Sequence, residues 1–189
     1  MTKEFTKEDQ RLMIAALKEA KKAFDKNEIP IGAVLTIGGK IIARGHNQTE
    51  KTQDATKHAE IICLQKGCRY LKSWRLYETI LYTTTEPCIM CLGAALLARI
   101  KKIICGCPNM RHGLKSICFL PLARQKKSRE CSSSLHSSNH QLKIVTGLMH
   151  AEAQSMLQNF FSMLRSFPTY KSSTSSCLKE ETTSKNSQE

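Results

Sequence analysis

The strongest constraint on the fold of this chain is the alternation of helix-like and strand-like segments in its first half. Thr6 and Asp9 form a capping pattern, and the apolar residues that follow recur at helical spacing until about Lys26. Two β-rich runs come next, at 31–37 and 40–45, and two glycines separate them. Because glycine adopts positive φ at little cost, this arrangement predicts a tight antiparallel hairpin.

Helices and strands continue to alternate in the remainder of the chain. Strands that are separated by helices favour parallel pairing, so the initial hairpin becomes the antiparallel part of a mixed sheet. We therefore expect an α/β fold, built as a three-layer α/β/α sandwich. The further expected elements are a helix at 57–70 that closes near Gly67, a strand at 79–85, a helix at 87–100, strands at 101–106 and 141–147, and a helix at 150–165.

Two segments fall outside this predicted core. Residues 124–139 are basic and rich in serine, which is typical of a loop. Residues 168–189 form a tail rich in Ser, Thr and Lys with few residues to bury, and we expect it to be disordered. The predicted organisation is one domain at 1–167 followed by a polar tail.

The charge balance of 29 Lys and Arg against 16 Asp and Glu gives a net charge of +13. Such an excess favours a polyanionic partner, above all a nucleic acid, although a basic surface also serves solubility alone. No apolar run approaches the roughly 20 residues that span a bilayer, and the N-terminus lacks the apolar region of a signal peptide. We therefore expect a cytoplasmic protein without a membrane partner, in which cysteines stay reduced.

Cys88 and Cys91 stand three residues apart directly behind Pro87, at the start of a predicted helix. Proline suits the first helical turn because it lacks an N–H group. Side chains at this spacing lie on one helical face, and the positive end of the helix favours thiolates. Taken alone, the pair is compatible with two core thiols, a redox pair or two ligands of a soft metal.

His58 and Glu60 stand at the start of another predicted helix, thirty residues upstream. With the two cysteines, His58 completes three N/S donors, which is typical of a catalytic zinc site that keeps one position for water of lowered pKa. Glu60 converges with His58 only if His58 lies at the very start of the helix, and a carboxylate there would act as a general acid and base. Taken singly, His58 also fits a structural histidine and Glu60 a solvated helix residue.

The pattern H-A-E followed by P-C-x-x-C is the known signature of zinc-dependent nucleobase deaminases, and the chain resembles the cytidine and deoxycytidylate deaminase superfamily. The stretches "AKKAFDKNEIPIGAVL", "GHN", "ATKHAEIICL", "LYTTTEPCIMCLGAALLARIKKIICG" and "NFFSMLR" are similar to bacterial tRNA-specific adenosine deaminases. This similarity covers about residues 8–107 well and 141–165 loosely. It implies a cytidine-deaminase-like mixed sheet, one Zn²⁺ per subunit, a homodimer, and conversion of the wobble adenosine (position 34) of an arginine tRNA to inosine.

The resemblance also implies roles for individual residues. The three N/S donors named above would bind zinc, and Glu60 would shuttle protons while hydroxide attacks C6 of a flipped-out adenine. Asn47 matches an asparagine that hydrogen-bonds the purine ring. Ile29 matches an apolar residue that lines the base pocket, although simple core filling explains it equally well.

The chain departs from the family pattern after the strand that ends near residue 106. An acidic residue and a lysine are usual there, whereas this chain has Asn109 and Arg111. Both remain candidate substrate contacts, but Asn109 adds no negative charge near the phosphates, which leaves tolerance for DNA open. The loop at 124–139 is longer than usual, and it could contact phosphate or remain a solvated insertion.

Two other functions are compatible with the same signature. A deaminase of free guanine, cytosine or dCMP would need the same zinc site, and a zinc-stabilised RNA-binding module would keep the ligands without catalysis. The basic charge and the wider resemblance favour a tRNA anticodon stem-loop over small substrates. The carboxylate of Glu60 favours an enzyme over a binding module.

Overall fold

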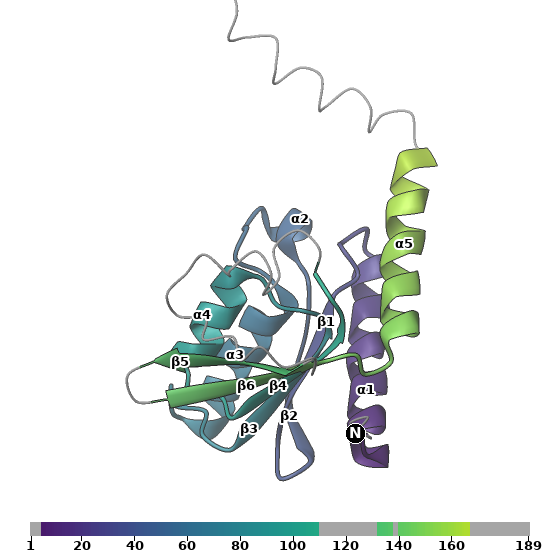
Figure 1. The fold of residues 1–189 in the computed structure, drawn as a ribbon. Coiled ribbons are helices and arrows are strands. Elements are labelled where there is room, and N and C mark those ends of the chain that lie inside the picture. The colour runs from purple at the N-terminus through teal and green to yellow at the C-terminus, as the bar shows by residue number, and fades with distance from the viewer. Residues whose placement is uncertain (1–4, 110–131, 138–139, 167–189) are drawn as a thin grey trace, which may run out of the picture.

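The computed structural model of this protein describes residues 5–109, 132–137 and 140–166. Its helices and strands follow the order expected from the sequence, with one short helix and one strand added (Figure 1). The elements are α1 (Lys7–Phe24), β1 (Gly32–Ile37), β2 (Lys40–His46), α2 (Thr49–Thr52), α3 (Ala59–Leu71), β3 (Thr79–Thr85), α4 (Ile89–Leu97), β4 (Lys102–Cys107), β5 (Ser132–Ser137), β6 (His140–Thr146) and α5 (His150–Ser166).

One mixed sheet of six strands forms the centre of the domain, in the order β2-β1-β3-β4-β6-β5. β1 pairs antiparallel with both β2 and β3, whereas β3, β4 and β6 run parallel to one another. β5 pairs antiparallel with β6 at the edge opposite β2. The hairpin and the parallel portion therefore combine as the sequence predicts.

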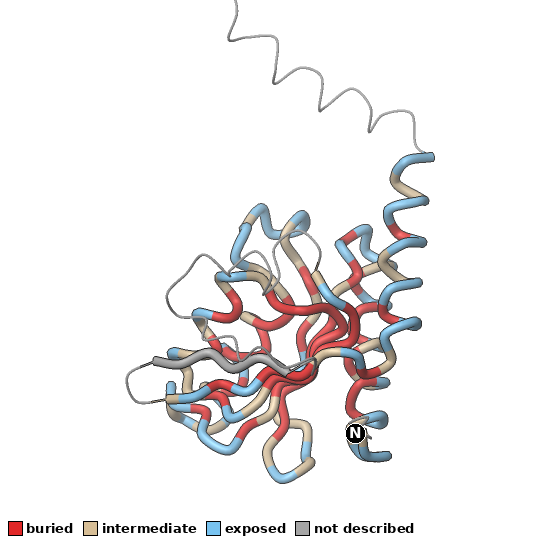
Figure 2. The backbone as a smooth tube through the Cα atoms, in the orientation of Figure 1, coloured by how far each residue is buried: buried red, intermediate tan, exposed pale blue. Residues whose placement is uncertain are grey.

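Helices cover both faces of the sheet, which confirms the three-layer α/β/α sandwich (Figure 1). α1 and α5 lie on one face, and α3 and α4 lie on the other. Each interface has its own apolar core, and the buried residues concentrate along the sheet between the two helical layers (Figure 2). The core beneath α1 includes Met13, Val34 and Ile104, and the core beneath α3 and α4 includes Leu35 and Leu92.

The N-terminus of α1 is held by the capping box that the sequence predicts. Thr6 Oγ1 accepts the Asp9 N–H and Asp9 Oδ2 accepts the Thr6 N–H, each at 3.0 Å. Asp9 Oδ1 also accepts a 2.7 Å hydrogen bond from the hydroxyl of Tyr82 on β3. Although burial raises the pKa of Asp9, the hydrogen bonds from Tyr82 and Thr6 outweigh it and lower this pKa below its ordinary value. One carboxylate thus fixes the helix start and joins it to the sheet.

Replacing Asp9 by alanine is expected to reduce the free energy of unfolding by about 1–2 kcal/mol, because the cap and the Tyr82 hydrogen bond are both lost. Since the pKa of Asp9 is lowered by folding, the carboxylate contributes to the stability of the fold at neutral pH. This contribution is lost as the pH falls through the ordinary value of 3.8 to the lower folded value. Urea unfolding at pH 7 and at pH 3 measures both effects. The difference in the free energy of unfolding between wild type and variant should be smaller at pH 3 than at pH 7.

The matched control for this prediction is Asp25→Ala, at the other end of α1. Among the described residues, the side chain of Asp25 forms only an exposed ion pair with Lys21, so its loss should cost less than about 0.5 kcal/mol. Equal destabilisation by the two substitutions would contradict the role assigned to Asp9.

Two sequence predictions about local structure were wrong, and one short helix was missed. The helix expected to close at Gly67 continues to Leu71, and Gly67 serves packing because a Cβ there would lie 2.3 Å from Leu35 Cδ2. Residues 132–137 were expected within a loop, yet their backbone pairs with β6 to form β5. This pairing is a tertiary contact that a serine-rich composition does not reveal. The short helix α2 was not predicted.

α5 completes the layer beside α1. The ring of Phe160 meets that of Phe24 edge to face at a centroid distance of 5.7 Å, and Phe160 is buried. Phe161, at the next helical position, is 37% exposed. The two adjacent phenylalanines therefore face different environments, as their helical spacing predicts.

Some sequence predictions concern parts of the chain outside the described residues. These are the candidate contact Arg111, the remainder of the basic loop (124–131 and 138–139), and the tail at 168–189. In the part of the chain that the structure describes, no helix is both long and apolar enough to cross a membrane.

Candidate active site

Two helix N-termini meet at one end of the sheet, and each begins with a predicted metal donor. His58 is the N-cap residue of α3 and Cys88 is the N-cap residue of α4, both in an extended backbone conformation. Neither side chain caps its own helix. The two side chains therefore remain available to a shared ligand, and the partial positive charge at both helix ends favours a thiolate there.

The three predicted donors form a triangle with equal sides. Sγ of Cys88 lies 3.6 Å from Sγ of Cys91, and each sulfur lies 3.6 Å from Nδ1 of His58. A tetrahedral zinc ion, with Zn–S of about 2.3 Å and Zn–N of about 2.0 Å, would separate the sulfurs by about 3.8 Å and sulfur from nitrogen by about 3.5 Å. The donor spacing therefore fits zinc, and three protein ligands are the number found in catalytic sites.

The electrostatics of the two thiols also point to a cation. The hydrogen bond with Cys91, with further help from His58, lowers the pKa of Cys88 to about 3. The same pairing with Cys88, together with burial, raises the pKa of Cys91. One thiolate thus opposes the ionisation of the other, and a divalent cation between them would offset both charges.

Glu60 lies beside this triangle and is only 3% exposed. Its Oε2 is 3.7 Å from Sγ of Cys91, and its Oε1 accepts a 3.2 Å hydrogen bond from the hydroxyl of Thr83 on β3. His58 precedes α3 whereas Glu60 belongs to its first turn, so side chains two residues apart both reach Cys91. Burial raises the pKa of Glu60, which suits a carboxyl that both takes up and releases protons.

Asn47 follows β2 and fixes the start of α3. Its side chain is buried, and its Oδ1 accepts a 2.9 Å hydrogen bond from the N–H of Ala59, the first residue of the helix. This bond satisfies one of the free N–H groups at the helix start, next to His58 and Glu60. Among the described residues, no hydrogen bond engages the amide nitrogen of Asn47, so this donor remains available for a ligand.

Glu28 organises the loop that leads into α3, a role that sequence reasoning missed. The Glu28 side chain is buried and accepts the N–H groups of Glu50 at 3.1 Å and Lys51 at 2.8 Å, which caps α2. Charge-assisted bonds of this kind hold α2 against the segment that carries Ile29, itself 37% exposed. In the sequence, Glu28 looks like any solvated loop carboxylate, and only its burial reveals the cap.

The predicted contact Asn109 lies beyond the C-terminal end of β4. Its backbone N–H donates a 3.2 Å hydrogen bond to Oε2 of Glu86, which directly precedes Pro87 at the turn that carries Cys88. Asn109 is thereby placed beside the beginning of α4. The structure brings His58 and the two cysteines into mutual contact and places Glu60 against Cys91. The outer candidates Asn47 and Asn109 lie against the starts of α3 and α4.

The fold and this donor set define a zinc-binding deaminase domain, and comparison with known proteins agrees. Residues 6–107 match the family model of the cytidine and deoxycytidylate deaminase zinc-binding region. The chain is 40% identical over 158 residues to the tRNA-specific adenosine deaminase of Bacillus subtilis (strain 168), a match that covers 84% of this chain and 91% of that protein. It is 41% identical over 160 residues to the chloroplastic tRNA(adenine(34)) deaminase of Arabidopsis thaliana. That match covers 82% of this chain but only 12% of the much longer plant protein.

A solved structure from a study of A-to-I editing by tRNA:A34 deaminases, at the wobble position of transfer RNA, shares the fold. The TM-score is 0.66 at 34% sequence identity, and the match covers 78% of this chain and 99% of that one. The chain therefore belongs to the cytidine and deoxycytidylate deaminase family, in the group of the tRNA-specific adenosine deaminases. The resemblance stated from the sequence motifs is confirmed.

Proposed function

We propose that this protein hydrolytically deaminates adenosine to inosine at position 34, the wobble position, of a tRNA anticodon, and that its substrate is an arginine tRNA. The observation that carries the proposal is the His58–Cys88–Cys91 triangle with the buried carboxyl of Glu60 beside it. The names of relatives about 40% identical support tRNA as the substrate. The net charge of +13 supports a polyanionic substrate independently.

The chemistry divides between a metal and the residues of the chain. One zinc ion per subunit, held by the three donors, would supply the Lewis acidity that makes water nucleophilic near neutral pH. Glu60 takes a proton from the attacking water and gives it to N1 of the adenine as the water oxygen bonds to C6. Glu60 then transfers the remaining hydroxyl proton to the exocyclic amine, the C6–N bond breaks, and ammonia leaves.

Thr83 acts as a positioning residue in this scheme, because its hydroxyl donates to Glu60 Oε1. Thr83→Val keeps the side-chain shape and removes that donor. We expect kcat to fall about tenfold, which corresponds to about 1.4 kcal/mol, with KM and zinc content unchanged. The matched control is Thr36→Val, which removes a hydroxyl bonded at the same 3.2 Å distance to the Ile80 carbonyl on the neighbouring strand. Equal loss of kcat in both variants would remove the positioning role.

Substrate recognition in this proposal uses four residues outside the donor triangle. Asn47 donates its available amide to the purine ring, and Ile29 lines the base pocket. Asn109 hydrogen-bonds a ribose hydroxyl, and Arg111 contacts phosphate. The proximity of Asn109 to the start of α4 supports its place in this scheme.

The proposal includes a homodimer in which the neighbouring subunit helps to bind the anticodon stem-loop. Sedimentation at several protein concentrations tests the assembly, and a monomer that retains full activity would contradict it. We place the protein in the cytoplasm, because a site built from thiolates needs reduced cysteines, and the cysteines of the described residues are free.

A substrate panel tests the proposed function against its alternatives. Zinc-loaded protein is incubated with an anticodon stem-loop that carries A34 and, in parallel, with free guanine, cytosine, adenosine and dCMP. We expect ammonia release from the stem-loop alone. Equal or greater turnover of a free base or nucleotide would favour a small-substrate deaminase. Binding of the stem-loop without any turnover of the panel would favour an RNA-binding module.

A further inference from the structure

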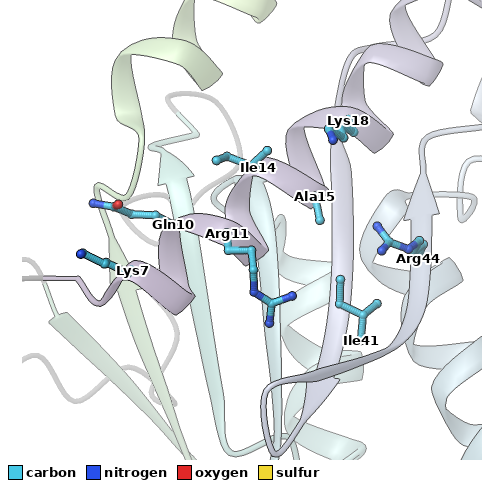
Figure 3. Close-up of a pocket in the computed structure, with 8 residues that line it drawn as sticks. All are labelled: Lys7, Gln10, Arg11, Ile14, Ala15, Lys18, Ile41 and Arg44. Atoms are coloured by element: carbon cyan, nitrogen blue, oxygen red, sulfur yellow. The ribbon is translucent and has the colours of Figure 1, made fainter.

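A groove on the outside of the domain, between α1 and the edge strand β2, is lined by several lysine and arginine side chains (Figure 3). Ile14 and Ile41 lie between the charged side chains, one on each element. Among the residues that the structure describes, no carboxylate lines this groove. Its cationic lining comes from both elements and consists of Lys7, Arg11, Lys18 and Arg44.

Lys18 and Arg44 in this lining have no counter-charge among the described residues. Arg11 contacts Glu8 at 3.4 Å and donates to the Gly39 carbonyl at 3.1 Å. Lys18 and Arg44, by contrast, are exposed, and their side chains form no hydrogen bond or ion pair with the described residues. A groove that holds uncompensated positive charge attracts an anionic ligand.

The cations of α1 also continue along the helix toward the active site. Lys22 binds one carboxylate oxygen of Glu19 at 2.7 Å, and the other oxygen lies 3.4 Å from Nδ1 of His46, directly before Asn47. These cations along α1 therefore form a row. It reaches from the β1–β2 turn, where Arg11 donates to Gly39, to the segment around Asn47 at the start of α3. Four of its members fall within an arc of about 60° around the helix axis and span about 22 Å, namely Lys7, Arg11, Lys18 and Lys22.

We propose that this groove binds backbone phosphates of the tRNA outside the reacting nucleotide. The inference rests on the proposed function and extends it to a second contact surface. A nucleic-acid strand presents regularly spaced negative charges, which a row of cations along one helix face can follow. Apolar Ile14 and Ile41 between the charges suit the sugar faces of such a strand. The row ends beside Asn47, so one RNA molecule can occupy the groove and the active site together.

The test compares two double variants that each remove one lysine and one arginine. Lys18→Gln/Arg44→Gln acts in the groove, and Arg69→Gln/Lys72→Gln removes exposed charges at the C-terminal end of α3, on the opposite face of the sheet. Affinity for full-length tRNA is measured by fluorescence anisotropy between about 50 and 200 mM salt. For the groove variant we expect at least about tenfold weaker binding near 100 mM salt and a log–log salt slope shallower by about 2. The control variant should match wild type in both respects.

Kinetics give a second readout. Since the groove does not touch the reacting base, the groove variant should show a raised KM for tRNA with an unchanged kcat. Equal salt slopes for the two variants would overturn the inference. An acidic protein surface would then be the favoured partner of the groove. If wild type binds tRNA through the groove but forms no inosine, the proposed function fails while the binding inference stands.

Discussion

Glu60→Gln is expected to abolish deamination while leaving the metal in place. Glutamine keeps the shape of the side chain and can still accept the hydrogen bond from Thr83, but it cannot take up and release a proton. General acid–base groups contribute roughly 10²- to 10⁴-fold, so we expect kcat to fall by at least that range. Because burial already disfavours the charged form of Glu60, the neutral amide should not destabilise the fold.

Single-turnover inosine formation and zinc content by elemental analysis measure the two halves of this prediction. The control is Glu50→Gln in α2, whose side chain is exposed and whose backbone N–H donates to Glu28, a bond that the substitution leaves in place. This control should retain wild-type turnover. Turnover within a few-fold of wild type for Glu60→Gln would remove the proton shuttle from the mechanism.

Cys91→Ala is expected to lose zinc and, with it, both activity and part of the stability of the fold. Cys91 sits 3.6 Å from each of the other two donors and 3.7 Å from Glu60, so its removal opens the triangle at the corner nearest the carboxyl. Two donors remain, and zinc binding that stabilises the native state is lost with the third. We expect metal content to fall from one ion per subunit to well below that, and the melting temperature to fall with it.

Cys63→Ala provides the matched control for the loss of zinc. Cys63 is equally buried, but its thiol donates to the Ala33 carbonyl at 3.2 Å and takes no part in the triangle. Its loss should lower the melting temperature modestly through a small cavity while zinc content stays at wild type. Undiminished zinc in Cys91→Ala would contradict the ligand set, whatever the change in melting temperature.

Local rules were sufficient to predict the elements whose causes lie within a few residues. Gly38 and Gly39 both adopt positive φ, of 54° and 75°, at the hairpin turn that their pairing predicts. The capping box of Thr6 and Asp9 starts α1 as expected. Turn and cap geometry depend on the residues themselves, so the sequence contains the whole signal.

Local rules could not predict the features that depend on residues distant in the sequence. Gly67 lies inside α3 because Leu35 approaches it from β1, and no local rule distinguishes that need from a helix end. The strand at 132–137 owes its existence to pairing with β6. Thr83 and Glu28 resemble ordinary strand and loop residues until burial and hydrogen bonding place them beside Glu60 and α2.

The candidate metal donors are an intermediate case between these two. The spacing of Cys88 and Cys91 places both on one helix face, but it cannot by itself bring His58 within 3.6 Å of them. That contact depends on two helices starting side by side at one end of the sheet, each with a donor at its N-cap. The motif identified the residues, and the fold supplies the reason that they meet.

The most direct test of the central claim is to incubate zinc-loaded protein with an arginine tRNA that carries adenosine at position 34 and to locate inosine by sequencing. The proposed function predicts A-to-I conversion at position 34 and at no other adenosine of the tRNA. Absence of inosine from protein with confirmed zinc, or conversion spread over other adenosines, would contradict it.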